Sequence, residues 1–278
     1  MRHEEIRMVA TDLDGTLMDD SGKISGQNTD TLLWLGERNI CRVIATGRNL
    51  FSAKKALPAD LPVDYLVFST GAGVVDWKTG ELIFSEHLKE NEVTLAVEIL
   101  TGAGMSFMVH GRVPDNHIFK YFDASCGISD FHRRCELYKD YGTPLDINSP
   151  DYANVSQILA IVPENLSLLE NVKNRLKSLK VIRTTSPLDG ESMWIEIFPE
   201  KISKGHAVEW LCNRLGINRA GTVGIGNDYN DTDMLNFVHH PFVVDNAPGP
   251  MKKLFGFCSS NNDHGFSDAV SRVLSRKK

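Results

Sequence analysis

Residues 12–17 read Asp-Leu-Asp-Gly-Thr-Leu and follow directly on an apolar stretch. If the chain stays extended there, side chains alternate, so Asp12 and Asp14 point the same way while Leu13 faces the core. Two carboxylates on one side repel each other unless a cation or a shared proton lies between them. Carboxylate oxygens are hard ligands that favour Mg²⁺. The pattern favours a functional site over the alternative, an acidic turn capped by Asp14.

Three further polar clusters have residue types that suit a charged ligand. Thr46 offers a hydroxyl, Gly47 permits close backbone approach, and Arg48 opens the next expected helix. Lys204 lies at an expected helix start, where the helix dipole disfavours a cation, so a bound anion would offset that cost. Residues 226–231, Gly-Asn-Asp-Tyr-Asn-Asp, offer two acids and two amides as oxygen ligands for a metal. Each cluster alone also fits a plain polar turn or a surface position.

The elements that must position these clusters alternate between strand and helix. The patterns predict strands at 6–11, 41–46 and 64–69 and helices at 29–38 and 50–57, an order typical of parallel βαβ units. Strands at 193–198, 222–225 and 242–244 and helices at 203–215, 231–237 and 267–274 continue that order after the middle of the chain.

The middle of the chain predicts a second module. Helices are expected at 92–100 and 166–179 and strands at 105–110, 155–162 and 180–185, whereas residues 111–154 give no clear pattern. We therefore predict an α/β fold with two domains. A Rossmann-like core with a parallel sheet comprises residues 1–82 and 192–278, and an inserted α+β cap comprises residues 83–191.

All four clusters follow strands that we expect to be parallel. Ligands of open α/β sheets bind at the carboxyl edge of the strands, so residues 12, 46, 204 and 227–231 can converge there. Two carboxylates, a hydroxyl, an ammonium and an acidic loop suit Mg²⁺-assisted phosphoryl transfer. The metal and the lysine screen the phosphoryl charge, which lets an anionic carboxylate attack.

Composition excludes several other classes of protein. The chain has 278 residues, of which 42% are apolar, and its 30 Lys+Arg against 36 Asp+Glu give a net charge of −6. A nucleic-acid binder is usually basic. A membrane span needs an apolar run of about 18 residues, which the sequence lacks. The polar first seven residues do not resemble a secretory signal. Five cysteines without a Cys-x-x-Cys pair indicate a reducing, cytoplasmic location.

The four clusters, taken in order, resemble the four motifs of the haloacid dehalogenase superfamily. The large insert between the second and third motifs is similar to that of the Cof-like phosphatases, which carry an α/β cap there. Ser-Thr-Gly-Ala at 69–72 resembles their Ser-Asn-Gly-Ala segment, and Asp-Asn-Ala at 245–247 resembles a Gly-Asn-Ala segment. The resemblance spans essentially the whole chain.

The resemblance implies a role for each matching residue. Asp12 would be the nucleophile that forms an aspartyl-phosphate, and Asp14 the general acid and then the base for water. Thr46, Gly47 and Lys204 would bind the phosphoryl group. The expected reaction is Mg²⁺-dependent hydrolysis of small phosphomonoesters, sugar phosphates above all.

The implied metal site contains one departure from the family. Asp12, Asp14, Asn227 and Asp231 are the expected Mg²⁺ ligands, but Asn227 stands where the family has an aspartate. An amide oxygen can ligate Mg²⁺ with one negative charge fewer, and Asp228 is the alternative if the loop shifts. Thr70 likewise stands where the family has an asparagine.

Two other functions remain open at this point. A phosphomutase would use the same aspartyl-phosphate but return the phosphate to a sugar. A non-catalytic member of the fold would only bind a phosphorylated ligand. In each case we expect a small phosphorylated metabolite as the partner, with no nucleic acid and no membrane. The oligomeric state is left open, a monomer being one alternative.

Overall fold

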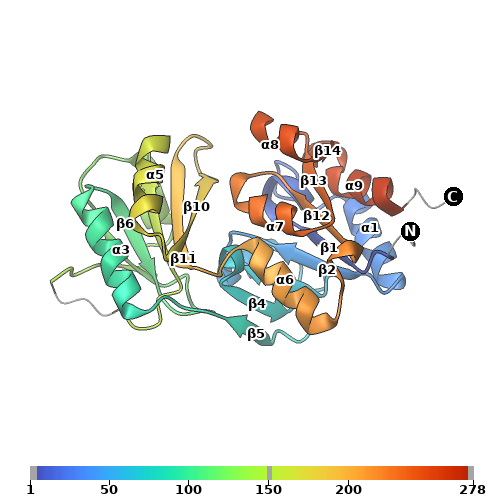
Figure 1. Ribbon diagram of the computed structural model, residues 1–278, viewed down its shortest axis with the longest axis horizontal. Coiled ribbons are helices and arrows are strands. Elements are labelled where there is room, and N and C mark those ends of the chain that lie inside the picture. The colour runs from blue at the N-terminus through green and yellow to red at the C-terminus, as the bar shows by residue number, and fades with distance from the viewer. Residues whose placement is uncertain (1–4, 149–151, 275–278) are drawn as a thin grey trace. The chain divides into compact units, whose positions relative to one another are not determined.

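The computed structural model describes residues 5–148 and 152–274, and it divides into two compact units (Figure 1). Unit 1 comprises the described residues of Met1–Arg48, Ser52–Phe84 and Ser203–Lys278. Unit 2 comprises those of Asn49–Phe51 and Ser85–Ile202. No helix in the described part of the chain is long and apolar enough to cross a membrane.

Unit 1 is built on an eight-stranded sheet with the order β14-β13-β12-β1-β2-β3-β4-β5. Neighbours from β14 to β3 run parallel, and β4 is antiparallel to β3. The strands are β1 (Met8–Thr11), β2 (Cys41–Ala45), β3 (Tyr65–Phe68), β4 (Gly73–Asp76), β5 (Leu82–Ser85), β12 (Thr222–Gly226), β13 (His240–Val244) and β14 (Gly256–Cys258). Because β1 is central and buried on both faces, it reads as a continuous apolar run.

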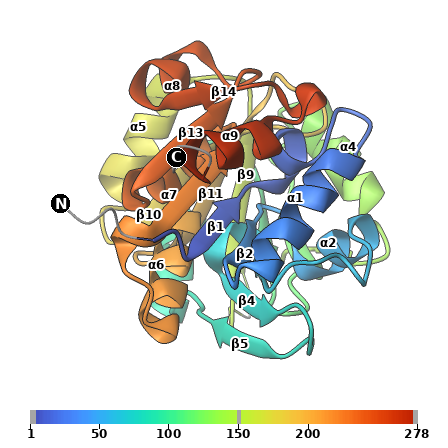
Figure 2. The ribbon, with the colours of Figure 1, turned by 90° about the vertical axis from the view of Figure 1, so that its right-hand side faces the viewer.

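Helices cover both faces of this sheet. Buried residues of α6 and α7 pack on the face to which Met8 and Ala10 of β1 point. Figure 2 shows α1 and α9 on the other face, where they contact each other. The helices are α1 (Gly26–Glu37), α2 (Leu50–Ala56), α6 (Lys204–Leu215), α7 (Thr232–Phe237), α8 (Gly249–Leu254) and α9 (Gly265–Leu274). This arrangement confirms the predicted α/β class with a parallel sheet.

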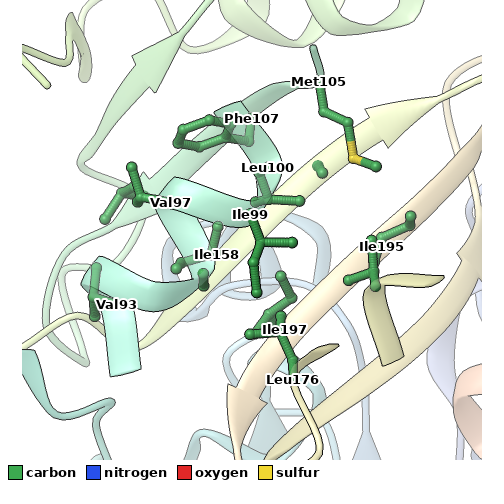
Figure 3. Packing of buried hydrophobic residues seen from close by; sticks show 14 of the residues in the cluster. Val93, Val97, Ile99, Leu100, Met105, Phe107, Ile158, Leu176, Ile195 and Ile197 are labelled. Carbon is green, nitrogen blue, oxygen red and sulfur yellow. The ribbon is translucent and has the colours of Figure 1, made fainter. Parts of the chain in front are cut away.

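Unit 2 is a six-stranded sheet with the order β10-β11-β9-β6-β7-β8, in which only β7 and β8 are parallel neighbours. Buried residues of α3 and α5 cover one face (Figure 3), and Phe131 of α4 packs on the other. The elements are α3 (Glu90–Gly102), β6 (Ser106–His110), β7 (Phe119–Phe122), α4 (Ser129–Leu137), β8 (Gly142–Pro144), β9 (Gln157–Val162), α5 (Leu166–Arg175), β10 (Leu179–Thr185) and β11 (Met193–Pro199).

The predicted boundary at residue 191 is wrong. Strand β11 was expected in the parallel core, but it pairs antiparallel with β9 and β10, and unit 2 continues to Ile202. A short apolar run predicts a strand equally well in either sheet, and only the pairing partners decide between them. The unassigned residues 111–154 contain β7, α4 and β8, apart from 149–151, which lie outside the described residues.

Candidate active site

Three of the four polar clusters begin where neighbouring strands of unit 1 end. Thr11 at the end of β1 lies opposite Ile44 of β2 and Ile225 of β12. The backbone amide of Asp12 still donates to the carbonyl of Ile225, at 2.8 Å, before the chain turns away. Since parallel strands end on the same edge, segments 12–17, 46–48 and 227–231 all leave the sheet there.

Lys204 reaches this edge by a different route from the predicted one. It does not follow a parallel strand of the core but is the first residue of α6, whose N-cap Ser203 accepts a hydrogen bond from the amide of His206. The adjacent Gly205 lets α6 approach α7 closely, because a Cβ there would lie 2.5 Å from the backbone of Asp233. The helix thus places the lysine among the acidic residues.

The Lys204 ammonium joins two buried carboxylates. Its Nζ lies 2.6 Å from Oδ1 of Asp12 and 2.6 Å from Oδ1 of Asp231. Asn230 Oδ1 also accepts from the same nitrogen, at 3.3 Å. The second oxygen of Asp12 accepts a hydrogen bond from the Thr16 hydroxyl at 3.1 Å. Lys204, Asp12 and Asp231 are all buried, so water screens their charges little.

The buried charges are unbalanced. Burial raises the pKa of Asp12 to about 7, with Asp231 and Asp14 adding to the rise and Lys204 opposing it. Burial would lower the pKa of Lys204, but Asp12 and Asp231 outweigh it, so that pKa is raised and the side chain stays an ammonium. One ammonium faces two buried carboxylates, so a further cation at Asp12 would balance the charge when both are ionised.

The turn after Asp12 brings the fourth cluster close. Leu13–Leu17 form one tight turn, in which Gly15 has a φ of 69°. A Cβ at Gly15 would lie 2.6 Å from Nδ2 of Asn227, so the missing side chain makes room for that residue. The structure therefore brings Asn227 beside the turn that carries Asp14.

Asp231 organises the loop that precedes it. Its Oδ2 accepts hydrogen bonds from the amides of Asn227, at 2.8 Å, and Asp228, at 3.0 Å, while its Oδ1 accepts from Lys204. Both oxygens of this carboxylate are therefore engaged with the protein itself. Asn227 and Asp228 are only half-buried and keep their side chains closer to solvent.

Thr46 and Gly47 form a turn at the end of β2. The buried Thr46 hydroxyl accepts a hydrogen bond from the amide of Arg48 at 3.1 Å. A Cβ at Gly47 would lie 3.5 Å from Nδ2 of Asn230, which is ordinary contact distance, so this turn lies against the fourth cluster. Arg48 itself donates two hydrogen bonds to Asp14.

Sequence reasoning missed three of these partners. It did not predict that Thr16 bonds Asp12, that Arg48 bonds Asp14, or that Asn230 bonds Lys204. Thr16 is part of the first motif, so its spacing of four residues from Asp12 was a usable signal. Arg48 and Asn230 meet partners distant in sequence, and no local pattern indicates those pairs.

The donors at this edge suit Mg²⁺. They are carboxylate, amide and main-chain oxygens, the hard ligands that this ion takes. Burial, with smaller contributions from Asp231 and Asp14, raises the pKa of Asp12, and a divalent cation beside that carboxyl would favour its ionised form. Within residues 5–148 and 152–274, no three His, Cys, Asp or Glu side chains are grouped to hold a metal by themselves. A magnesium site here therefore needs amide or main-chain oxygens as well.

The sequence model of the haloacid dehalogenase-like hydrolase family matches residues 9–273, which is nearly the whole chain. The chain belongs to the haloacid dehalogenase-like hydrolases. The predicted superfamily with its Cof-like subfamily is confirmed, and so is the predicted enzyme class, a phosphatase of this superfamily.

Relatives of this hydrolase carry phosphatase names. A putative phosphatase of Streptococcus pyogenes serotype M6 is 25% identical over 274 residues, covering 96% of this chain and 98% of that protein. The 5-amino-6-(5-phospho-D-ribitylamino)uracil phosphatase YwtE of Bacillus subtilis is 25% identical, covering 97% and 99%. A solved phosphatase of the superfamily from Bacteroides thetaiotaomicron has a TM-score of 0.76 at 16% identity, covering 96% and 95%, which shows a shared fold.

Proposed function

We propose that this hydrolase is a Mg²⁺-dependent phosphatase of small phosphomonoesters that works through an aspartyl-phosphate on Asp12. The observation that carries the proposal is the placement of Asp12. Its buried carboxylate lies between the Lys204 ammonium and the Thr16 hydroxyl, at the sheet edge where Thr46 and Asp14 also lie. A nucleophile held in this way is oriented and partly desolvated before substrate arrives.

The first step transfers the phosphoryl group to the protein. A carboxylate oxygen of Asp12 attacks phosphorus while the bond from phosphorus to the leaving oxygen breaks. Asp14 gives that oxygen a proton, so the product leaves as an alcohol. Lys204 and the Thr46–Gly47 turn bind the phosphoryl oxygens and stabilise the charge that spreads over them.

The second step releases inorganic phosphate. Asp14, now a carboxylate, takes a proton from water as the water oxygen attacks the phosphorus of the aspartyl-phosphate. The bond between phosphorus and the Asp12 oxygen breaks, and both aspartates return to their starting state. One residue thus serves as acid and then as base, as a double displacement requires.

Mg²⁺ would be held by Asp12, the main-chain carbonyl of Asp14 and the Asn227 side chain, with Asp231 ordering the loop and Asp228 as the alternative ligand. When bound, the ion neutralises phosphoryl charge. The contacts of Asp231 support a loop-ordering role, because both of its oxygens already accept hydrogen bonds from the protein.

We infer that the substrates are sugar phosphates or related metabolites. One relative is named for a substrate with a phosphorylated ribityl group, which is a polyhydroxylated alkyl phosphate. Unit 2, by its position in the sequence between Arg48 and Lys204, would serve as the cap that reads the non-phosphate part.

The test is phosphate release from a panel of phosphorylated metabolites, measured with Mg²⁺ and with EDTA. Hydrolysis of sugar phosphates that needs Mg²⁺ and stops in Asp12→Asn supports the proposal. Transfer of phosphate to a second sugar instead of water would identify a phosphomutase. Tight binding of phosphorylated compounds without turnover would identify a non-catalytic binding protein.

A further inference from the structure

The turn between β1 and α1 depends on side chains from elsewhere in unit 1. Within residues 13–18 the amide of Met18 donates to the carbonyl of Leu13 at 2.9 Å. Three other carbonyls of the turn, those of Gly15, Leu17 and Met18, each accept a hydrogen bond from an asparagine side chain. This turn carries Asp14 and Thr16, so its backbone decides where both side chains point.

Asn28 binds the end of the turn from α1. Its Nδ2 donates to the carbonyl of Leu17 at 3.1 Å, and its Oδ1 accepts from the Ser267 hydroxyl of α9 at 2.8 Å. The Asn28 side chain is buried. The turn is thereby tied to two helices that pack against each other.

Asn261 and Asn246 bind the turn from two later loops. Nδ2 of Asn261, which is also buried, donates to the carbonyl of Met18 at 3.2 Å. Nδ2 of Asn246 donates to the carbonyl of Gly15 at 2.8 Å, and its Oδ1 accepts from the amide of Asn261 at 3.1 Å. The two asparagines therefore hold each other as well as the turn.

The chemistry of the asparagine side chain explains why asparagine suits these three positions. An asparagine side chain donates with one end and accepts with the other, and Asn28 and Asn246 do both here. An aspartate of the same shape can accept but cannot donate to a carbonyl at neutral pH. The exchange of one asparagine for aspartate therefore removes the contact with the turn while keeping the size of the side chain.

We propose that Asn28, Asn246 and Asn261 are positioning residues that hold the 13–18 backbone so that Asp14 can protonate the leaving group. The inference rests on the proposed role of Asp14 as the general acid. Gly15 alone would leave the turn free to adopt several conformations, since glycine reaches both signs of φ. Three donors on carbonyls of one short turn restrict it to the conformation that the chemistry needs.

Asn246→Asp is the most informative variant. Asn246 is exposed, so a carboxylate is solvated there and can still accept from the amide of Asn261, but the donor to Gly15 is lost. Asn236→Asp, on an exposed residue of α7, makes the same change of charge away from the turn and is the matched control. Asn261→Ala removes a buried donor and should give a larger effect.

The readout is kcat/KM on glycerol phosphate, whose alkoxide needs a proton, and on p-nitrophenyl phosphate, whose leaving group does not. This ratio reports the transfer of the phosphoryl group to Asp12 and leaves out the later hydrolysis of the aspartyl-phosphate, in which Asp14 is the base for both substrates. We expect Asn246→Asp to lower kcat/KM on glycerol phosphate about tenfold, because small displacements of a catalytic group cost up to about 100-fold. The kcat/KM on p-nitrophenyl phosphate should change less than about twofold, because its transfer step needs no proton from Asp14. Asn236→Asp should match the wild type on both substrates.

Hydrogen exchange provides a readout that needs no turnover. The amides of residues 14–18 should exchange faster in Asn246→Asp and Asn261→Ala than in Asn236→Asp, with the rest of unit 1 unchanged. Unchanged exchange, or equal loss of kcat/KM on both substrates, would overturn the positioning role.

Asp14→Asn, measured beside these variants, separates the two proposals. If it loses activity selectively on glycerol phosphate and the asparagine variants do not, the positioning role is wrong and the proposed function stands. If Asp14→Asn shows no such selectivity, Asp14 is not the general acid, and the positioning role proposed for the three asparagines is wrong as well. Should Asn261→Ala fail to fold, the exposed Asn246→Asp still decides.

Discussion

The guanidinium of Arg48 holds both oxygens of Asp14, with Nε 2.8 Å from Oδ2 and the second nitrogen 2.6 Å from Oδ1. The two side chains are 31% and 43% exposed. An ion pair with that exposure contributes only about 0–1 kcal/mol to stability. Asp14 can therefore leave Arg48 at small cost when a substrate binds, and Arg48 keeps it in place between turnovers.

The role of Asp14 predicts a dependence on the leaving group. Asp14→Asn should lower kcat/KM on alkyl phosphates by about 100-fold or more, the usual contribution of a general acid. The kcat/KM on p-nitrophenyl phosphate should fall far less, because its leaving group needs no proton and this ratio leaves out the second step, in which Asp14 is the base. A series of phosphates with leaving groups of graded pKa measures this. Equal loss across the series would show that Asp14 is not the acid.

The nucleophile is tested by Asp12→Asn, which deletes the attacking oxygen while keeping the size of the side chain. We expect turnover to be lost and the circular dichroism spectrum to be unchanged, since Lys204 still has Asp231 as its partner. Asp30→Asn, on an exposed residue of α1, is the matched control and should keep full activity. Substantial phosphate release by Asp12→Asn would rule out an aspartyl-phosphate on Asp12.

The raised pKa of Asp12 predicts how stability depends on pH. The value rises from 3.8 to about 7 in the folded protein, so the folded state binds a proton that the unfolded chain releases between those pH values. The bound proton of Asp12 therefore contributes fully to the free energy of unfolding below pH 3.8, the pKa of Asp12 in the unfolded chain. This contribution is lost as the pH rises through about 7. At 1.36 kcal/mol per pKa unit, the loss is at most ~4 kcal/mol.

Thermal unfolding without metal, compared between wild type and Asp12→Asn, isolates this contribution. Between about pH 4 and pH 7 the melting temperature of the wild type should fall relative to that of the variant. Added Mg²⁺ at neutral pH should raise it again, because the ion compensates the charge of the Asp12 carboxylate. A difference between the two proteins that stays constant with pH would contradict the assignment.

The metal site is tested at Asn227. Two unit charges ~4 Å apart at an effective dielectric of ~20 interact by about 4 kcal/mol, and a divalent ion doubles this. Desolvation of the added carboxylate cancels much of that gain. Asn227→Asp should therefore tighten Mg²⁺ binding about tenfold, or ~1.4 kcal/mol.

Mg²⁺ activation of phosphate release across four variants decides which residue binds the ion. Asp231→Ala should weaken activation much more than any change at Asn227, because it releases Lys204 and the amides of Asn227 and Asp228 together. If Asn227→Ala changes nothing while Asp228→Ala raises the Mg²⁺ requirement steeply, then Asp228 is the ligand.

Local patterns were sufficient for the parts of the site that lie within one element. An apolar run ending in two aspartates predicted β1 and the turn that carries Asp12 and Asp14. The helix expected at 203–215 corresponds to α6, and the structure shows Ser203 as its N-cap and Gly216 with a φ of 63° as its C-cap. Capping and turn formation depend on neighbours within a few residues, which a sequence displays directly.

Other features depended on partners far away in the chain. No local pattern links the residues that meet in three places. These are the pairing of β11 with β9, the ion pair of Arg48 with Asp14, and the hydrogen bond from the Asn261 side chain to the carbonyl of Met18. An apolar strand satisfies its hydrogen bonds in either sheet, and an exposed polar side chain fits many turns. Only the packed fold decides, because burial requires each polar group to find its partner in three dimensions.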